Sequence, residues 1–133
     1  MFKPVKLTYY RTGAARLLFI LFGGLVANVS LVMADSLPVP FVHAKGNKLY
    51  QDNCAICHGT TLNGTKQGPP LLHPYYKPSH HADFAFYRAA LKGVQAHHWE
   101  FGDMPPVKGI TREDMDAIVP FIRWYQKEKG LIN

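Results

Sequence analysis

The chain has 133 residues and carries 15 lysines and arginines against nine aspartates and glutamates, which gives a formal net charge of +6. Four of the basic residues and none of the acidic ones lie in residues 1–34, so the remaining 99 residues have a net charge of only +2, and the basic balance is no argument for nucleic acid binding. The two cysteines are too few for a structural zinc site built from two C-x-x-C pairs.

Residues 1–34 have the parts of a secretory signal peptide. A basic start is followed by an apolar run that begins at Leu17 and ends with the small residues Val32 and Ala34, which suit a cleavage site. We therefore expect a leader that is removed on export. The alternative is an uncleaved membrane anchor, because the run approaches the roughly 18 apolar residues of a spanning helix. In both cases residues 35–133 form one exported domain, which we expect in the periplasm.

A first helix is expected over residues 43–53, and NCAICHG, residues 53–59, follows it. Two cysteines three apart with a histidine next to the second fit a zinc site, a dithiol switch or a covalently attached haem. A zinc site would have to use both Cys57 and the adjacent His58 as ligands, which is an awkward geometry for a tetrahedral ion. A thioredoxin-like dithiol normally lies in a fold of alternating strands and helices, and the sequence has no convincing strand pattern after residue 35. C-x-x-C-H is the attachment signature of haem c, so Cys54 and Cys57 are predicted to bind the haem vinyl groups, with His58 as an axial ligand.

Two loops and a middle helix follow the cysteine motif. Glycine and proline recur through residues 59–78 and predict a loop, and residues 97–108 predict another. Between them a helix is expected over residues 83–92, capped by Ser79 or Asp83 and stopped by Gly93. Helical spacing predicts one apolar face for this helix, made by Phe84, Tyr87, Ala90 and Leu91.

The last helix is predicted to begin after Thr111, with Asp114 as its partner in a capping box. Pro120 lies inside this helix and removes the hydrogen bond to the Asp116 carbonyl, which predicts a kink or a local opening. Its apolar stripe is expected to contain Ile118, Phe121, Ile122 and Tyr125.

These elements predict an all-α fold with three or more helices and long loops. No strand pattern occurs after residue 35. A domain of this size has a thin core of its own, and long loops rich in glycine and proline are uncommon in a compact domain unless they serve a function. Wrapping one flat, apolar haem is such a function, so we expect the haem at the centre of the core.

Over residues 43–127 the chain resembles the class I c-type cytochromes, which are small monohaem electron carriers. Gly46 and Tyr50 stand eight and four residues before the first cysteine, where that family places a glycine and an aromatic residue on its first helix. Ile118 and Phe121 match the partners of these residues on the last helix. The resemblance implies that the glycine lets the first and last helices cross closely.

The resemblance also implies roles for three residues outside the cysteine motif. Gly68-Pro69-Pro70-Leu71 is similar to the G-P-x-L loop of the family, in which the proline carbonyl accepts a hydrogen bond from the proximal histidine, so Pro69 is expected to orient His58. Met104, in the sequence GDMPP, is similar to the distal methionine ligand, so His58 and Met104 are the expected iron ligands. Trp99 corresponds to the tryptophan that binds a haem propionate.

The sequence contains other candidate ligands and surface groups. Met115 is the other methionine after the leader, but it lies early in a helix, whereas Met104 lies in a loop that can approach the iron. His97 and His98 are the alternative sixth ligands. The remaining histidines are expected at the surface or in loops: His43, His73, His80 and His81. Three lysines are either ordinary solvated surface or a ring around an exposed haem edge: Lys66, Lys77 and Lys108.

An iron with both axial positions filled by the protein can change its charge without binding a substrate. The sequence therefore predicts a periplasmic one-electron carrier and no enzyme: a monomer that exchanges electrons with redox proteins and contacts the membrane only through its N-terminal segment. One alternative is a haem protein with a displaceable sixth ligand, which would bind gases or act like a peroxidase. Another is a dedicated cytochrome subunit of a larger oxidoreductase.

Overall fold

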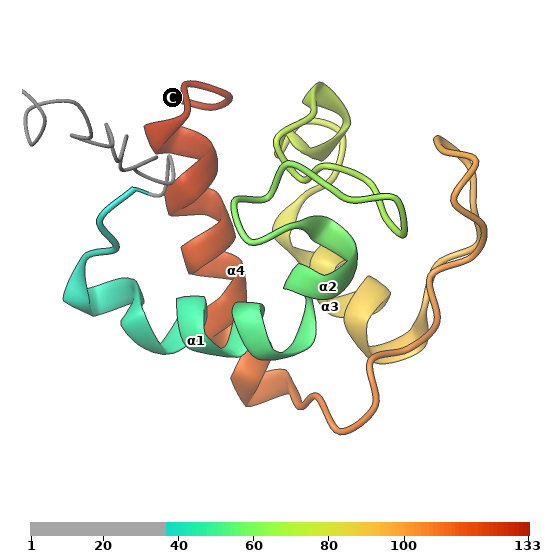
Figure 1. Cartoon of the computed structure of the whole chain (residues 1–133), viewed down its shortest axis with the longest axis horizontal. Helices are drawn as coiled ribbons and strands as arrows, with labels where there is room; N and C mark the ends of the chain where they lie inside the picture. Colours follow the sequence, from blue (N-terminus) through green and yellow to red (C-terminus); the bar gives the residue numbers. More distant parts are fainter. Residues whose placement is uncertain (1–36) are drawn as a thin grey trace, which may run out of the picture. The chain divides into compact units, whose positions relative to one another are not determined.

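The computed structural model describes residues 37–133, and helices are the only regular secondary structure in this part of the chain (Figure 1). The elements in chain order are η1 (Phe41–His43), α1 (Ala44–Asn53), α2 (Ala55–His58), η2 (Pro74–Tyr76), α3 (Asp83–Lys92) and α4 (Arg112–Glu128). The predicted all-α architecture is thus confirmed. The predicted leader, residues 1–34, lies outside the described residues. Within residues 37–133 no helix combines the length and the hydropathy that crossing a membrane requires.

Helices α1 and α4 cross at close range, as the sequence predicted (Figure 1). The crossing depends on Gly46, because a Cβ atom at this position would lie 2.1 Å from the backbone oxygen of Ala117 on α4. One turn further along α1, the buried ring of Tyr50 packs against Phe121 with 5.5 Å between the ring centroids. No residue larger than glycine fits at this contact without moving one of the two helices.

The beginning of α4 is fixed by the predicted capping box. The backbone N–H of Asp114 donates to the Thr111 hydroxyl at 3.1 Å, and the Thr111 N–H donates back to the Asp114 carboxylate at 3.0 Å. The helix continues through the exposed Pro120, so the proline does not interrupt it. The predicted apolar stripe is confirmed, since all four of its residues are buried: Ile118, Phe121, Ile122 and Tyr125.

The bounds of α3 agree with the prediction, but its predicted cap is wrong. The N-cap residue is Ala82, and no side chain makes a capping hydrogen bond there. Ser79 lies outside the helix, and Asp83 is its first residue. The Asp83 carboxylate instead accepts a hydrogen bond from Nε of Arg123 on α4 at 2.7 Å, and this long-range partner replaces the expected local one.

The predicted apolar face of α3 is also wrong in part. Phe84 is 66% exposed and Leu91 is at the surface, whereas Phe86 and Ala90 are the buried residues of the helix. Phe86 and Ala90 are four residues apart and therefore lie on one side of α3. The helix is rotated relative to the prediction so that this side faces the interior.

Two polar residues of α4 hold the loop that leads from residue 71 to residue 81. Gln126 is fully buried, and its Nε2 donates to the Leu71 carbonyl at 2.8 Å. The guanidinium of Arg123 donates to the carbonyls of Tyr76 and His81, both at 2.6 Å. Because backbone carbonyls buried in a loop need donors, these two side chains fix the path of a segment that has little regular structure.

Candidate functional site

The two cysteines and His58 lie on a single helical turn. Helix α2 begins directly after Cys54, whose backbone N–H still donates to the Tyr50 carbonyl of α1 at 2.8 Å. The turn closes through the bond from the His58 N–H to the Cys54 carbonyl at 2.9 Å. Both thiols are free and half-buried. The C-x-x-C-H spacing therefore places two thiols and one imidazole side by side on a short rigid element.

The protonation state of Cys54 argues against a dithiol redox switch. Burial raises the pKa of the Cys54 thiol to about 11, and the neighbouring Cys57 contributes in the same direction. Redox-active thiols normally have a lowered pKa, because the thiolate is the reactive form. At neutral pH the Cys54 thiol is thus protonated and unsuited to fast disulfide exchange.

His58 is held in one orientation by the loop that follows the motif. Its Nδ1 donates to the Pro69 carbonyl at 2.9 Å, which leaves the lone pair on Nε2. Burial lowers the pKa of His58, although the bond to Pro69 acts in the opposite direction. Gly68 brings the loop this close, since a Cβ atom there would lie 2.9 Å from the Cys57 carbonyl oxygen. A neutral imidazole with one nitrogen bound to a carbonyl is the usual state of a metal-ligating histidine.

Next to His58 lies a large cavity with an apolar lining. Its volume is about 1020 Å³ when the open space at its mouth is counted. The helices contribute apolar lining residues, several of them small: Tyr50, Ala85, Phe86, Ala89, Ala90, Met115, Ile118 and Ile122. The loops contribute Leu71, Val94, Trp99, Phe101, Met104 and Val107. Such a lining suits a large apolar group.

Met104 lines this cavity and also a second one; we call the first, which is lined by more residues, the larger cavity and the second the smaller cavity. Cys54, His58 and Met104 line both cavities. The loop that carries Met104 is closed by an antiparallel bridge, in which Val94 and Met104 exchange two backbone hydrogen bonds of 2.9 Å. Gly93, with φ of +79°, makes the tight start of this bridge possible, because a Cβ atom there would lie 2.6 Å from the Met104 carbonyl oxygen. The thioether is therefore carried by a fixed segment of an otherwise irregular loop.

Trp99 places an unused hydrogen-bond donor at the larger cavity. Its Nε1 is buried and makes no hydrogen bond of good geometry within the protein. The Tyr76 side chain lies nearby: burial raises the pKa of Tyr76, and the Trp99 side chain lowers it. Leaving a buried donor unpaired costs about 1–3 kcal/mol, so such groups usually have a partner in the functional state. Trp99 thus fits a group that brings an acceptor into the cavity, as a haem carboxylate does.

The structure brings together all the residues that the sequence selected for the site. Each of them lines at least one of the two cavities: Cys54, Cys57, His58, Pro69, Trp99 and Met104. The alternative ligands His97, His98 and Met115 also line the larger cavity, but none of them lines the smaller one beside His58. A pair of thiols, a neutral imidazole, a thioether and an unpaired donor around an apolar space fit a covalently bound haem.

The site predicted from the sequence did not include Gln126 and Arg123, two side chains that support the wall of the larger cavity without lining it. Gln126 and Arg123 hold the loop that includes Leu71 and Tyr76, and both of these loop residues line the larger cavity. A signal for Gln126 was present in the sequence, because it follows Ile122 by four residues and so continues the buried stripe of α4 with a polar residue. A polar side chain at a core position normally has a specific hydrogen-bond partner.

Comparison with known proteins gives one match. The family model described as cytochrome c matches residues 43–126, which is more than half of the chain. Searches among curated proteins and among solved structures gave no significant match.

Proposed function

Because the chain belongs to the cytochrome c family, whose members are haem electron carriers, we propose that it is a periplasmic one-electron carrier with His58 and Met104 as the axial ligands of its iron. Haem c is the cofactor, attached covalently through Cys54 and Cys57 of the C-x-x-C-H motif. The observation that carries the ligand proposal is the placement of His58 and Met104, which line the same two adjoining cavities.

The bound haem supplies an iron that alternates between the ferrous and ferric states. The surrounding residues fix its environment. Pro69 holds the His58 ring, so the imidazole needs little reorientation when the charge at the site changes. The bridge between Val94 and Met104 does the same for the thioether. The apolar lining excludes water from the site, and a thioether ligand raises the reduction potential relative to a second histidine.

We further propose that residues 1–34 direct export, since haem attachment to thiols requires cysteines that have not formed a disulfide and this chemistry takes place in exported proteins of bacterial type. The partners are then other exported redox proteins.

The proposal is tested by Met104→Ala in the haem-loaded protein. Removing the thioether should open the sixth position, so the ferrous variant should bind carbon monoxide, whereas the unchanged protein should not. Met115→Ala is the matched control, because this methionine also lines the larger cavity and should act through packing alone. If His97→Ala or His98→Ala opens the iron to carbon monoxide and Met104→Ala does not, the sixth ligand is a histidine.

A further inference from the structure

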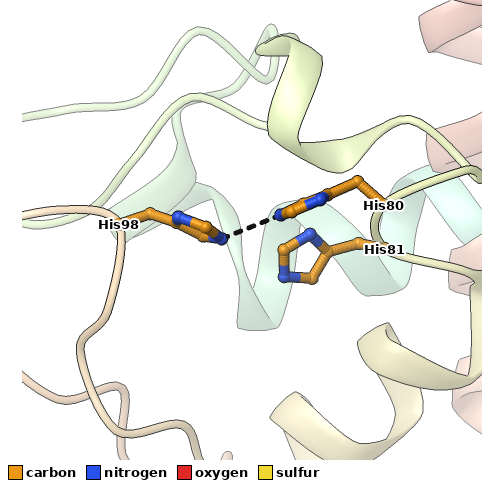
Figure 2. Close-up of side chains that lie close together, drawn as sticks. All are labelled: His80, His81 and His98. Carbon is orange, nitrogen blue, oxygen red and sulfur yellow. Dashed lines mark hydrogen bonds between the residues drawn. The ribbon is translucent and has the colours of Figure 1, made fainter.

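Three histidines that the proposed haem ligation does not use lie close together, and two of them, His81 and His98, also line the larger cavity. His80 and His81 belong to the loop after η2, and His98 belongs to the loop between α3 and α4. One ring nitrogen of each lies within 4.8 Å of those of the other two. Figure 2 shows the rings of His80 and His98 pointing at each other through their Nε2 atoms, 3.1 Å apart, with His81 beside them. We call these three residues the histidine cluster.

The separations in the histidine cluster are close to those around a tetrahedral metal ion. With zinc–nitrogen bonds of about 2.0–2.1 Å, two ligand nitrogens stand roughly 3.3 Å apart. His80 and His98 already have nearly this separation. A tetrahedral arrangement requires the His81 nitrogen to come closer to those of His80 and His98 by at most about 1.5 Å, since its present distance from them is no more than 4.8 Å.

The surroundings of the histidine cluster hold its rings in position. Nδ1 of His81 donates to the Tyr75 carbonyl, which leaves the lone pair of His81 on Nε2. The backbone of His81 is fixed by Arg123, which donates to its carbonyl at 2.6 Å. The ring of His98 stacks on Tyr75 with 4.2 Å between centroids. An imidazole whose second nitrogen donates to a backbone carbonyl is the usual supporting arrangement of a metal-ligating histidine.

We propose that His80, His81 and His98 form a binding site for a divalent late transition-metal ion, with water as the fourth ligand. Three imidazoles suit Zn²⁺ and Cu²⁺, and among such ions Cu²⁺ generally binds most tightly. Mg²⁺ and Ca²⁺ prefer oxygen ligands, and no carboxylate among the described residues belongs to the cluster. The site differs from the proposed axial positions at the haem, which His58 and Met104 occupy.

Binding of an ion at this cluster has a consequence for the haem, and this part rests on the proposed function. His81 and His98 also line the larger cavity, so a dication held by them adds positive charge to the cavity wall. Positive charge near the haem favours the reduced iron, which carries one charge less. Binding of Zn²⁺ should therefore raise the reduction potential.

The test is a calorimetric titration of the haem-loaded protein with Zn²⁺, which is redox-inert. We expect one ion per chain, no change in the haem ligation spectrum, and a rise in the reduction potential at saturation. Loss of an outer-shell partner weakens metal sites about 10- to 100-fold, so His80→Gln, His81→Gln and His98→Gln should each weaken binding at least roughly ten-fold. The matched control is His43→Gln, since His43 stacks on Trp124 and is outside the cluster.

Two results would overturn the site: no stoichiometric Zn²⁺ binding to the unchanged protein, or binding that survives in the triple variant of His80, His81 and His98. Stoichiometric binding that depends on the cluster but leaves the potential unchanged would refute only the link to the haem. If haem attachment fails, the proposed function falls, and the calorimetric titration of whatever folded protein is obtained still decides the metal site.

Discussion

Single residues at the site were predicted where the chemistry is local. The C-x-x-C-H spacing predicts the roles of Cys54, Cys57 and His58. A short loop motif predicts the role of Pro69, whose carbonyl does accept the hydrogen bond from His58. Roles that depend on distant partners were not predictable in this way. Gln126 accepts a hydrogen bond from Arg123, three residues earlier on α4, but the bond that holds the loop, from Gln126 to the Leu71 carbonyl, joins residues 55 positions apart.

This bond gives a residue-scale prediction. Gln126→Leu keeps the size of the side chain but leaves the Leu71 carbonyl without its donor, so the free energy of unfolding should fall by about 1–3 kcal/mol. Urea unfolding followed by circular dichroism measures the change. Gln51→Leu is the control, because Gln51 donates to the carbonyl of Thr60 at the surface, where water can replace it. Equal stability of Gln126→Leu and the unchanged protein would show that this bond does not hold the loop.

Helices were predicted well where their ends carry local signals. Thr111 and Asp114 fix the start of α4, and Gly93 ends α3 with a positive φ, as the sequence indicated. The side of α3 that faces the interior was not predicted, because Phe84 and Phe86 are equally apolar residues. The choice between them depends on packing against α4, which includes the ion pair of Asp83 with Arg123.

The capping box of α4 makes stability depend on pH. Two hydrogen bonds donated to the Asp114 carboxylate lower its pKa: the one from the Thr111 side chain has the larger effect, and the one from the Thr111 backbone N–H has the smaller effect. A carboxyl group with a lowered pKa in the folded state stabilises the fold above its unfolded value of about 3.9, and this contribution is lost as the pH falls through the lower folded value. Asp114→Asn should therefore lower the Tm at neutral pH, and the difference from the unchanged protein should shrink below about pH 4. A Tm difference that persists unchanged to pH 2 would contradict this linkage.

At the scale of the whole molecule, the core and the haem site are built from the same side chains. Buried residues of α1, α3 and α4 form most of the core and also line the larger cavity. The sequence predicted this arrangement from the small size of the domain and its long loops. It did not predict the histidine cluster, because His98 is separated by 18 residues from His80 and only the loop path brings them together.

Folding and haem attachment should therefore be coupled. Replacing both Cys54 and Cys57 with alanine should give a colourless chain that is unstable and poorly helical, because the ligand that stabilises the folded state is no longer held. Expression in the periplasm with the haem-attachment machinery, followed by acid–acetone extraction and circular dichroism, measures both effects. Met104→Ala should keep its haem through extraction, since both thioether links remain. A stable, cooperatively folded double variant without haem would contradict the central role of the cofactor.

The most direct test of the central claim is the reduction potential of Met104→His in the haem-loaded protein. A second imidazole should keep the iron six-coordinate and low-spin, but it favours ferrous iron less than a thioether does, so the potential should fall and the sulfur-to-iron absorption band should disappear. Met115→His, at the other methionine that lines the larger cavity, should retain that band. Ligation by His58 and Met104 predicts a clear drop in potential for Met104→His; an unchanged potential and an unchanged spectrum would show that Met104 is not the second axial ligand.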